Sequence, residues 1–308
     1  EFNTLWAIAA SPSGSPASPA APIDLPASSV LYAEWSPTQP NTVAYSTAEK
    51  TARAPGWQAN NDLWLTAWAE NKKKKTLEFT TTQLLDASSG GVYGWWGTGF
   101  AFSPDGLDIA YARTDSIGLV NLVTLSQTEL AQFTAYNTHS DWAWYPALRW
   151  GPDGRFIYTV THGAPIGLEA PEDSPAFNLT VLAAASSLQA DLVPRAGMFA
   201  DPLPSPEVSA RGAVDRFRIA FLQAIEPDNS AFSRYRLGVM DRDGSNVRFI
   251  FPAEDQPGLT ANASFAWSPD GRRLAVVYDG NLWIMDADTG VSQQLTGDGL
   301  TTKVVWGR

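Results

Sequence analysis

The sequence contains no cysteine, only two histidines and few charged residues for its length. The absence of cysteine excludes disulfides, thiol catalysis and cysteine metal sites, although it does not fix the cellular compartment. No apolar run approaches about 20 residues, so we expect no segment that spans a membrane as a helix. The formal charge of −11 opposes sequence-independent binding to nucleic acids and attraction to anionic lipids. We therefore expect neither a nucleic-acid partner nor a transmembrane span.

Aromatic residues, by contrast, are abundant: the 308 residues include 13 Trp, 9 Tyr and 14 Phe. With 44% hydrophobic residues the chain can bury a large core, which argues against wholesale disorder. Aromatic side chains favour β-strands and also suit binding interfaces. The chain begins at Glu1 without a methionine, and we expect it to be a processed or engineered piece. The central question is which tryptophans build the fold and which bind something.

A unit of four short strands recurs along the chain. Its clearest copy has an apolar strand ending at Trp267, a Ser-Pro-Asp-Gly turn, and further strands at 274–278, 281–285 and 291–296. Proline at the first corner and glycine after aspartate suit a tight turn. The residue before the turn, here called the anchor, recurs at Trp35, Phe102, Trp150, Trp267 and Trp306, with a degraded copy at Val208. A unit of about 40 residues with insertions is typical of four-stranded propeller blades.

The two ends of the chain supply parts of one further unit. Leu5-Trp6 resembles the third-strand motif at Leu282-Trp283, and a fourth strand is expected near Ile23, whereas Trp306 belongs to a first strand. We predict an all-β, single-domain, six-bladed β-propeller of four-stranded antiparallel blades, its ring closed by N- and C-terminal strands sharing one blade. The expected segments are 1–28 (late strands of the shared blade), 31–79, 98–136, 146–194, 204–252 and 263–297 (complete blades), and 302–308 (first strand of the shared blade). The second strand of the shared blade is missing, so that blade is short or the natural protein continues past Arg308.

The Trp/Phe-Ser-Pro-Asp-Gly anchors, the Asp/Asn-Leu-Trp third strands and the Asp-Ala-Asp-Thr-Gly turn at 286–290 resemble the TolB-type β-propeller repeat. The resemblance covers essentially the whole chain and implies a bacterial protein that is exported and acts by protein–protein contact. The repeat carries no catalytic residues. It also occurs in the propeller domains of serine peptidases, whose chemistry resides in a separate hydrolase domain. No Gly-x-Ser-x-Gly elbow of such a hydrolase occurs in this chain.

Long insertions are expected to converge on one face of the ring. Those between second and third strands are 47–61, 161–177 and 224–235, and those between blades are 80–97, 134–145, 194–205 and 252–263. In a four-stranded meander both classes of loop lie at the same face, at one mouth of the channel. Because long loops on a rigid scaffold commonly carry binding sites, we predict that this long-loop face is functional.

The tryptophans divide along the same line. Those at repeated positions, which we assign to packing between blades, are Trp6, Trp35, Trp64, Trp150, Trp267, Trp283 and Trp306. Others lie in or beside long loops among polar groups, as partner sites do. The candidate binding residues are Trp57, Trp95, Trp96, His139, Asp141, Trp142, Trp144, Tyr145 and His162. The competing interpretation is that the loop tryptophans fold back to cover small loop cores.

Evidence for catalysis or metal binding is thin. His139 and His162 lie near Asp141, Glu169 and Asp173, but without ligand-type spacing we interpret both as ordinary surface histidines. Asp241-Arg242-Asp243-Gly244 resembles the opening of a calcium loop, yet it falls at a hairpin turn where aspartate caps the backbone. We predict no catalytic residues, no metal and no cofactor.

The sequence thus favours a non-catalytic, exported bacterial scaffold in the periplasm, at the cell surface or outside the cell. It would bind a protein or cell-envelope component through the long-loop face. One alternative is a carbohydrate-binding or glycan-processing propeller, because aromatic faces stack on sugars. Another is the regulatory propeller of a larger hydrolase. The architecture itself decides between none of these, because propellers host unrelated activities.

Overall fold

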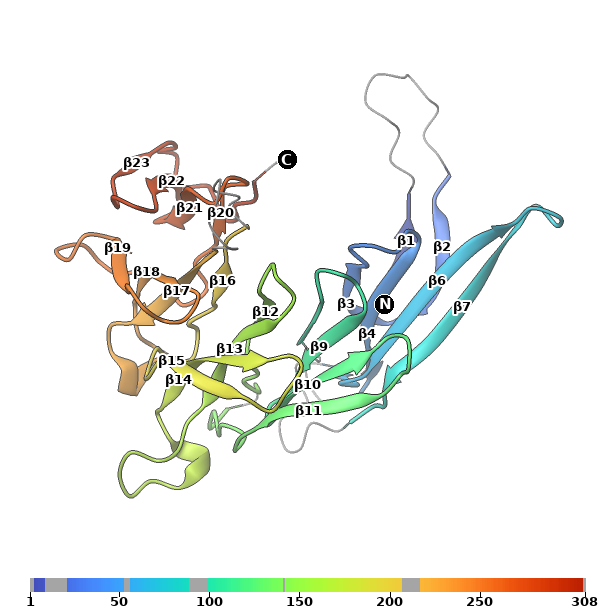
Figure 1. Ribbon diagram of the computed structural model, residues 1–308, viewed down its shortest axis with the longest axis horizontal. Helices are drawn as coiled ribbons and strands as arrows, with labels where there is room; N and C mark the ends of the chain where they lie inside the picture. The colour runs from blue at the N-terminus through green and yellow to red at the C-terminus, as the bar shows by residue number, and fades with distance from the viewer. Residues whose placement is uncertain are drawn as a thin grey trace.

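The computed structural model describes residues 3–8, 21–52, 56–88, 99–140, 142–206 and 217–306. The architecture is all-β, as predicted, and consists of antiparallel sheets that follow one another around an arc (Figure 1). Five of these sheets are blades in which consecutive strands pair as neighbours. The first strands of blades 2 to 5 are only two to four residues long, and the second strands of blades 2, 3 and 4 are largely buried. The repeat predicted from the sequence is therefore the building unit of the fold.

The strands of each blade are consecutive in sequence. Blade 1 contains β3 (Val30–Trp35), β4 (Thr42–Lys50), β6 (Leu63–Asn71) and β7 (Thr76–Leu85), with β5 (Trp57–Ala59) paired to the end of β4. Blade 2 contains β8 (Gly99–Phe102), β9 (Asp108–Ala112), β10 (Ser116–Asn121) and β11 (Gln127–Gln132). Blade 3 contains β12 (Leu148–Trp150), β13 (Phe156–His162), β14 (Phe177–Ala183) and β15 (Gln189–Val193). Blade 4 contains β16 (Leu203–Pro204), β17 (Arg218–Ala224), β18 (Tyr235–Asp241) and β19 (Arg248–Phe251). Blade 5 contains β20 (Phe265–Trp267), β21 (Arg273–Tyr278), β22 (Asn281–Asp286) and β23 (Ser292–Gln294). Short 3₁₀ turns occur at Pro171–Asp173 and Pro227–Asn229.

The turn after each anchor is held by its serine. The Ser268 hydroxyl donates to the Asp270 carboxylate (2.6 Å) and accepts from the Arg273 amide (2.9 Å), while Gly271 has φ +64°. Ser103 makes the same pair of bonds, to Asp105 (2.6 Å) and from the Asp108 amide (3.0 Å). These bonds satisfy backbone groups that a tight turn leaves without ladder partners. They explain why Ser-Pro-Asp-Gly recurs where a first strand turns into a second.

Blade 4 departs from the sequence-based alignment. Its anchor is Pro204 rather than Val208, because Ser205 occupies the position of Ser103 and Ser268. The Ser205 amide donates to the Arg218 carbonyl (2.7 Å), and its hydroxyl accepts from the Arg218 amide (3.0 Å). Val208 lies outside the described residues. The sequence Pro-Ser-Pro lacks both the aromatic residue and the Asp-Gly pair, so the repeat is not recognisable there by eye.

Hydrophobic side chains fill the interfaces between consecutive blades. Between blades 4 and 5, Leu222 and Leu237 pack in one cluster with Trp267 and Leu274. Each fully buried side chain of this size contributes roughly 1.5–3 kcal/mol. The core is therefore a series of similar layers rather than a single centre, as expected when repeats stack side by side.

The same kind of tryptophan hydrogen bond joins blade 2 to blade 3, blade 4 to blade 5, and blade 5 to the C-terminal residues. Trp150 Nε1 donates to the Ala101 carbonyl (3.0 Å), Trp267 Nε1 to the Leu203 carbonyl (2.8 Å), and Trp306 Nε1 to the Ala266 carbonyl (3.0 Å). In each case the acceptor is the residue just before the anchor of the preceding blade. Trp306 therefore occupies the place of an anchor belonging to a blade after blade 5.

The predicted closure of the ring by strand pairing is not seen. Strands β1 (Thr4–Ala7) and β2 (Ile23–Ser28) form a separate two-stranded sheet, and residues 301–306 are not in a strand. Ala7 and Leu25 pack against Val43 and Trp68 of blade 1, so this hairpin lies at the blade 1 end of the arc. The C-terminal residues lie on the other side of the opening (Figure 1). Among the described residues no strand lies between these two parts, so neither has the neighbour that a ladder requires.

Incomplete closure changes the interpretation of two tryptophans. Trp6 and Trp35, which we assigned to packing between blades, are both 53% exposed. Trp267, whose neighbouring blade is complete, is only 6% exposed. The assignment is wrong for the first two in this structure, because the blade that would cover them is incomplete.

Candidate functional site

Counting back from each anchor identifies the side chains around the channel. The residue before the anchor is Glu34, Ala101, Arg149, Leu203, Ala266 or Val305 in successive blades. The residue three positions before the anchor is Tyr32, Gly99, Ala147, Asp201, Ser264 or Lys303. Side chains two apart on a strand share a face, so the two rows lie on one side of the first strands. Members of both rows line two cavities that meet at Ala147 and Arg149.

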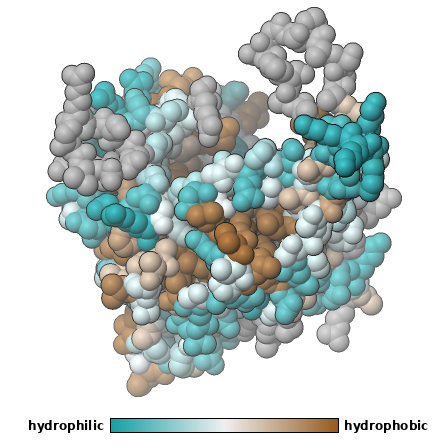
Figure 2. Space-filling view, turned by 45° about the vertical axis from the view of Figure 1, so that its right-hand side comes forward, coloured by the Kyte–Doolittle hydropathy of each residue, from teal (hydrophilic) through white to brown (hydrophobic). Residues whose placement is uncertain are grey.

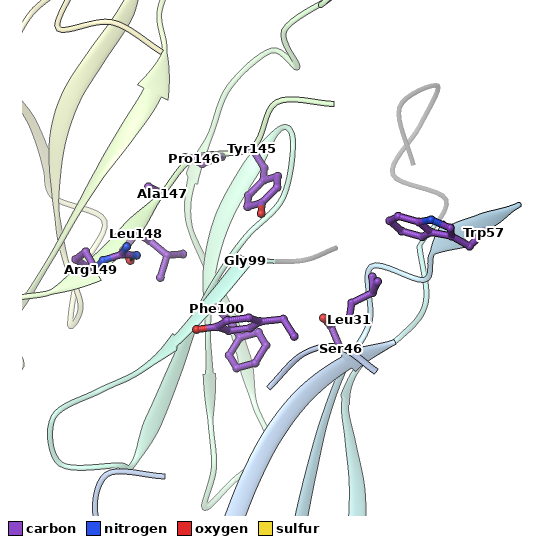
Figure 3. Close-up of a pocket in the computed structure, with 11 residues that line it drawn as sticks. Leu31, Ser46, Trp57, Gly99, Phe100, Tyr145, Pro146, Ala147, Leu148 and Arg149 are labelled. Carbon is purple, nitrogen blue, oxygen red and sulfur yellow. Dashed lines mark hydrogen bonds between the residues drawn. The ribbon is translucent and has the colours of Figure 1, made fainter. Parts of the chain in front are cut away.

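The first cavity, of about 520 Å³, lies beside the first strands of blades 1, 2 and 3 (Figure 3). Trp57 approaches it from the β4–β5 hairpin and Tyr145 from the loop before β12, while Arg149 lies at the opposite side from Trp57. The other lining residues are Leu31, Tyr32, Ser46, Gly99, Phe100, Pro146, Ala147 and Leu148. The walls are therefore mostly apolar and aromatic, with one cationic group, which is the usual character of a recognition site.

Small residues of blade 2 create room for the aromatic wall. A Cβ on Gly99 would lie 3.0 Å from Cε2 of Tyr145, so the tyrosine ring rests directly against the glycine backbone. Tyr32 meets Phe100 edge to face, with ring centroids 5.1 Å apart. Burial raises the pKa of both Tyr32 and Tyr145 above the ordinary tyrosine value, which keeps their hydroxyls neutral. These rings offer flat apolar surface with hydrogen-bonding hydroxyls.

The second cavity, of about 730 Å³, extends from Arg149 toward blade 5 and the C-terminal residues. Trp142 stacks on Phe199 there, with ring centroids 6.5 Å apart. Asp201, Ser264 and Lys303 add polar groups to its lining. Its wall draws on three long insertions, namely 134–145, 194–205 and 252–263. Long loops thus meet beside the channel, as the topology of the repeat predicts.

Arg149 carries the central positive charge. Its Nη1 donates to the Leu148 carbonyl (2.9 Å), and its Nη2 lies 3.5 Å from Asp201 Oδ1. Glu34, two residues along β3 from Tyr32, is partly buried, and desolvation raises its pKa to about 7 despite the opposing charge of Arg149. Arg149 therefore interacts with Asp201 in the lining of the second cavity and with the charge of Glu34 on β3.

The structure places three of the predicted residues at this site as partly exposed side chains. Trp57, Trp142 and Tyr145 line the cavities while remaining partly exposed. Trp144 touches the second cavity but is 3% exposed, donates from Nε1 to the Met198 carbonyl (3.1 Å) and packs edge to face on Phe177. For Trp144 the competing interpretation, that it covers a loop core, is correct. Trp95, Trp96 and Asp141 lie outside the described residues.

The two histidines behave differently from each other. His139 is exposed, and its Nε2 lies 3.0 Å from Asp173 Oδ1, as suits a surface residue. His162 is 5% exposed, so the prediction of a surface histidine is wrong for it. Its Nδ1 and Nε2 lie 2.7 and 2.8 Å from the carbonyls of Thr134 and Ser174, and its ring stacks on Phe177. His162 therefore connects the loops that contain Thr134 and Ser174 to β13, and its ring nitrogens are not available to a partner.

Sequence reasoning missed several residues of the site. Tyr32, Glu34, Phe100 and Arg149 lie on first strands, which we interpreted only as carriers of the anchor. For Tyr32, Glu34 and Arg149 the position relative to the anchor is the signal that could have found them, because that position repeats in every blade, whereas Phe100 lies two residues before its anchor and carries no such signal. Ser46 carries no such signal, since it becomes a cavity residue only through its pairing with Tyr32 across β3 and β4.

The described residues contain no group of three or more His, Asp or Glu side chains that could hold a metal ion. At the calcium-like turn, Asp243 accepts from the Ser245 amide (3.0 Å) and hydroxyl (2.6 Å), as a capping aspartate does. No helix in the described part of the chain is long and apolar enough to cross a membrane.

Comparisons with known proteins agree with this architecture. Residues 239–308 match the family model described as the dipeptidyl peptidase IV (DPP IV) N-terminal region. A search of curated proteins finds no match. A structure from a study of two prolyl endopeptidases aligns with a TM-score of 0.50 at 13% identity, over 87% of this chain and 36% of that one. This chain therefore spans well under half the length of that peptidase.

The alignments with two further structures cover most of those chains. A putative TolB from Agrobacterium tumefaciens aligns at 14% identity over 85% of this chain and 78% of that one, with a TM-score of 0.41. The β-propeller domain of the Trilobed protease from Pyrococcus furiosus aligns at 17% identity over 84% and 81%, with a TM-score of 0.33. Together with the repeated Ser-Pro-Asp-Gly turns and the five four-stranded blades, the comparisons confirm the predicted fold class: the chain is an all-β propeller built from four-stranded antiparallel blades.

Proposed function

We propose that this propeller is a non-catalytic, exported bacterial scaffold that binds a protein or cell-envelope partner at the long-loop mouth of its channel. The observation that carries the proposal is the pair of adjoining cavities, to which three of the predicted loop aromatics contribute. Hydrophobic atoms also gather near the middle of one face, bordered by hydrophilic ones (Figure 2). An aromatic centre with a polar rim is the usual anatomy of a protein interface. Export and a bacterial source are extended to this chain from its resemblance to TolB-type repeats.

Site-specific photocrosslinking tests the proposal. A benzoylphenylalanine at position 145 would lie in the wall shared by both cavities, whereas one at position 123 lies on the exposed β10–β11 turn, away from them. We expect position 145 to crosslink a discrete protein or envelope component in the source cells, and we expect the adduct to diminish when Trp142→Ala is added. Equal labelling from both positions, or none from position 145, would contradict a partner site at the channel mouth.

A carbohydrate ligand is the second candidate, and Trp142 is the observation that favours it. Its half-buried ring is stacked on Phe199 beside Asp201 and Lys303, so an aromatic face adjoins polar groups. Sugars bind where an apolar face and hydrogen-bonding groups adjoin. A glycan array decides the matter: a robust hit that is lost in Trp142→Ala supports the sugar, and an array without hits favours the protein partner.

The third possibility is that the propeller regulates an attached hydrolase. The family match and the prolyl endopeptidase alignment both concern propeller regions of peptidases. We propose no activity for this chain itself, since its cavities contain neither a nucleophile beside a base nor the elbow motif. The complete gene would decide this point, because a hydrolase would appear in the same reading frame.

A further inference from the structure

The guanidinium of Arg149 has unused hydrogen-bonding capacity. It has five N–H donors, yet within the described part of the chain it makes only the bond to its neighbour's carbonyl and the long contact with Asp201. Its side chain is 45% exposed and faces both cavities. An arginine with this geometry is suited to a two-pronged bond with an incoming carboxylate.

A second polar group in the same cavity also lacks a partner. Ser46 is fully buried, and its hydroxyl finds no hydrogen-bond partner among the described residues. It lines the first cavity together with Trp57 and Leu31 on the blade 1 side, facing Arg149 and Leu148 across it (Figure 3). A buried hydroxyl left unpaired costs free energy, so native proteins rarely retain one without a use. Because Ser46 both donates and accepts, it would suit a peptide group.

Glu34 acts as an internal competitor for Arg149. It belongs to the channel-facing row of blade 1, and its charge interacts with that of Arg149 in blade 3. The equivalent position of blade 2, which lies between these two blades, is occupied by Ala101 and adds no charge. Tyr32, two residues before Glu34 on the same strand, interacts with both Glu34 and Arg149, and its raised pKa keeps it a neutral phenol. A ligand carboxylate would therefore compete with Glu34, and with the partly exposed Asp201, for the charge of Arg149.

We propose that the first cavity recognises a carboxylate of a peptide segment, with Arg149 as its counter-ion, Ser46 as a backbone contact and the ring of Tyr145 against an apolar side chain. This inference rests on the proposed function and specifies the chemistry of the partner at the same site. The carboxylate belongs either to the C-terminus of the partner or to an aspartate or glutamate side chain. Aromatic walls on both sides of the charge favour a segment whose neighbouring residues are apolar.

Peptide arrays distinguish the two sources. N-acetylated hexapeptides are synthesised with a free C-terminal carboxylate and again with a C-terminal amide, each set with and without Asp and Glu. Binding that disappears on amidation assigns the C-terminal carboxylate, and binding that follows Asp or Glu regardless of the C-terminus assigns the side chain. Either result supports the proposal.

Variants of the full chain test whether Arg149, Ser46 and Glu34 determine the affinity for the peptide. Using the best free-acid peptide as probe, we expect Arg149→Gln to weaken binding about tenfold or more, with Arg149→Lys intermediate. Ser46→Ala should weaken it less. Arg155→Gln, an exposed arginine on the turn after β12, is the matched control. Glu34→Gln should instead strengthen binding about threefold at pH 8, a gain that simple loss of structure would not produce. Circular dichroism confirms that each variant is folded.

The outcomes separate this inference from the proposed function. If peptides bind equally as acids and amides, with or without Asp and Glu, and Arg149→Gln has no effect, the carboxylate inference is overturned while the scaffold function stands. If no peptide binds, the inference is also overturned, and crosslinking at position 145 still decides whether a partner uses the channel mouth.

Discussion

At the residue scale, Glu34 links the site to pH. Its folded-state pKa of about 7 lies above the ordinary value of a glutamate, chiefly because burial disfavours the charged carboxylate. A raised acid pKa means that this group contributes most favourably while it is protonated. Its contribution is present below the unfolded pKa, near 4.5, and is lost as the pH rises through about 7.

The variant Glu34→Gln should therefore become relatively more stable as the pH rises. We expect it to match the parent chain near pH 5 and to exceed it by about 1 kcal/mol at pH 8, a figure reduced for partial solvent screening. Urea titrations at the two pH values measure the difference. Glu129→Gln, at an exposed position on β11, should show no such divergence. A constant gap between parent and Glu34→Gln would contradict the raised pKa.

At the element scale, the turns are the part of the structure that the sequence predicted best. The pairs Asp105-Gly106 and Asp270-Gly271 predict tight turns directly, because only a few residue types favour the backbone conformations of such turns. Blade 4 was misaligned because Pro204-Ser205-Pro206 keeps the serine bonds without the other signals. Local chemistry therefore located the turns, whereas contacts such as Ser46 beside Tyr32 depend on strand pairing and could not be read locally.

Ser268→Ala tests the contribution of one such turn. The variant loses the bond to the Asp270 carboxylate and the bond from the Arg273 amide, and we expect a loss of about 1–2 kcal/mol in the free energy of unfolding. Denaturant titration measures this value. Ser292→Ala, at an exposed position on β23, serves as the matched control and should be nearly neutral. A neutral Ser268→Ala would show that the turn is held by Pro-Asp-Gly alone.

At the scale of the whole molecule, the prediction of six blades rested on the two chain ends, and there the structure is open. Three tryptophans join blades through the same indole-to-carbonyl bond, but Trp35, the anchor of blade 1, is 53% exposed. By the rule that the other three follow, its acceptor in a closed ring would be the carbonyl of Val305. Sequence identified the anchors, yet whether the ends meet depends on long-range geometry that no local motif encodes.

Comparing Trp267→Phe with Trp35→Phe measures this difference. In the open arc we expect Trp267→Phe to cost about 1–3 kcal/mol, because it leaves the Leu203 carbonyl without its partner, and Trp35→Phe to be nearly neutral. Thermal and urea unfolding provide both values. Equal losses in the two variants would show instead that Trp35 is bonded in solution and that the ring is closed.

The tryptophan bonds between blades also determine how the molecule would respond to force. Two of them join consecutive blades, the third joins blade 5 to the C-terminal residues, and the N-terminal hairpin and the C-terminal residues lie at opposite sides of the opening (Figure 1). Tension applied between the ends would thus pass from one blade interface to the next in series. Such a chain yields at one terminal interface at a time, in a sequence of separate extensions of one blade each.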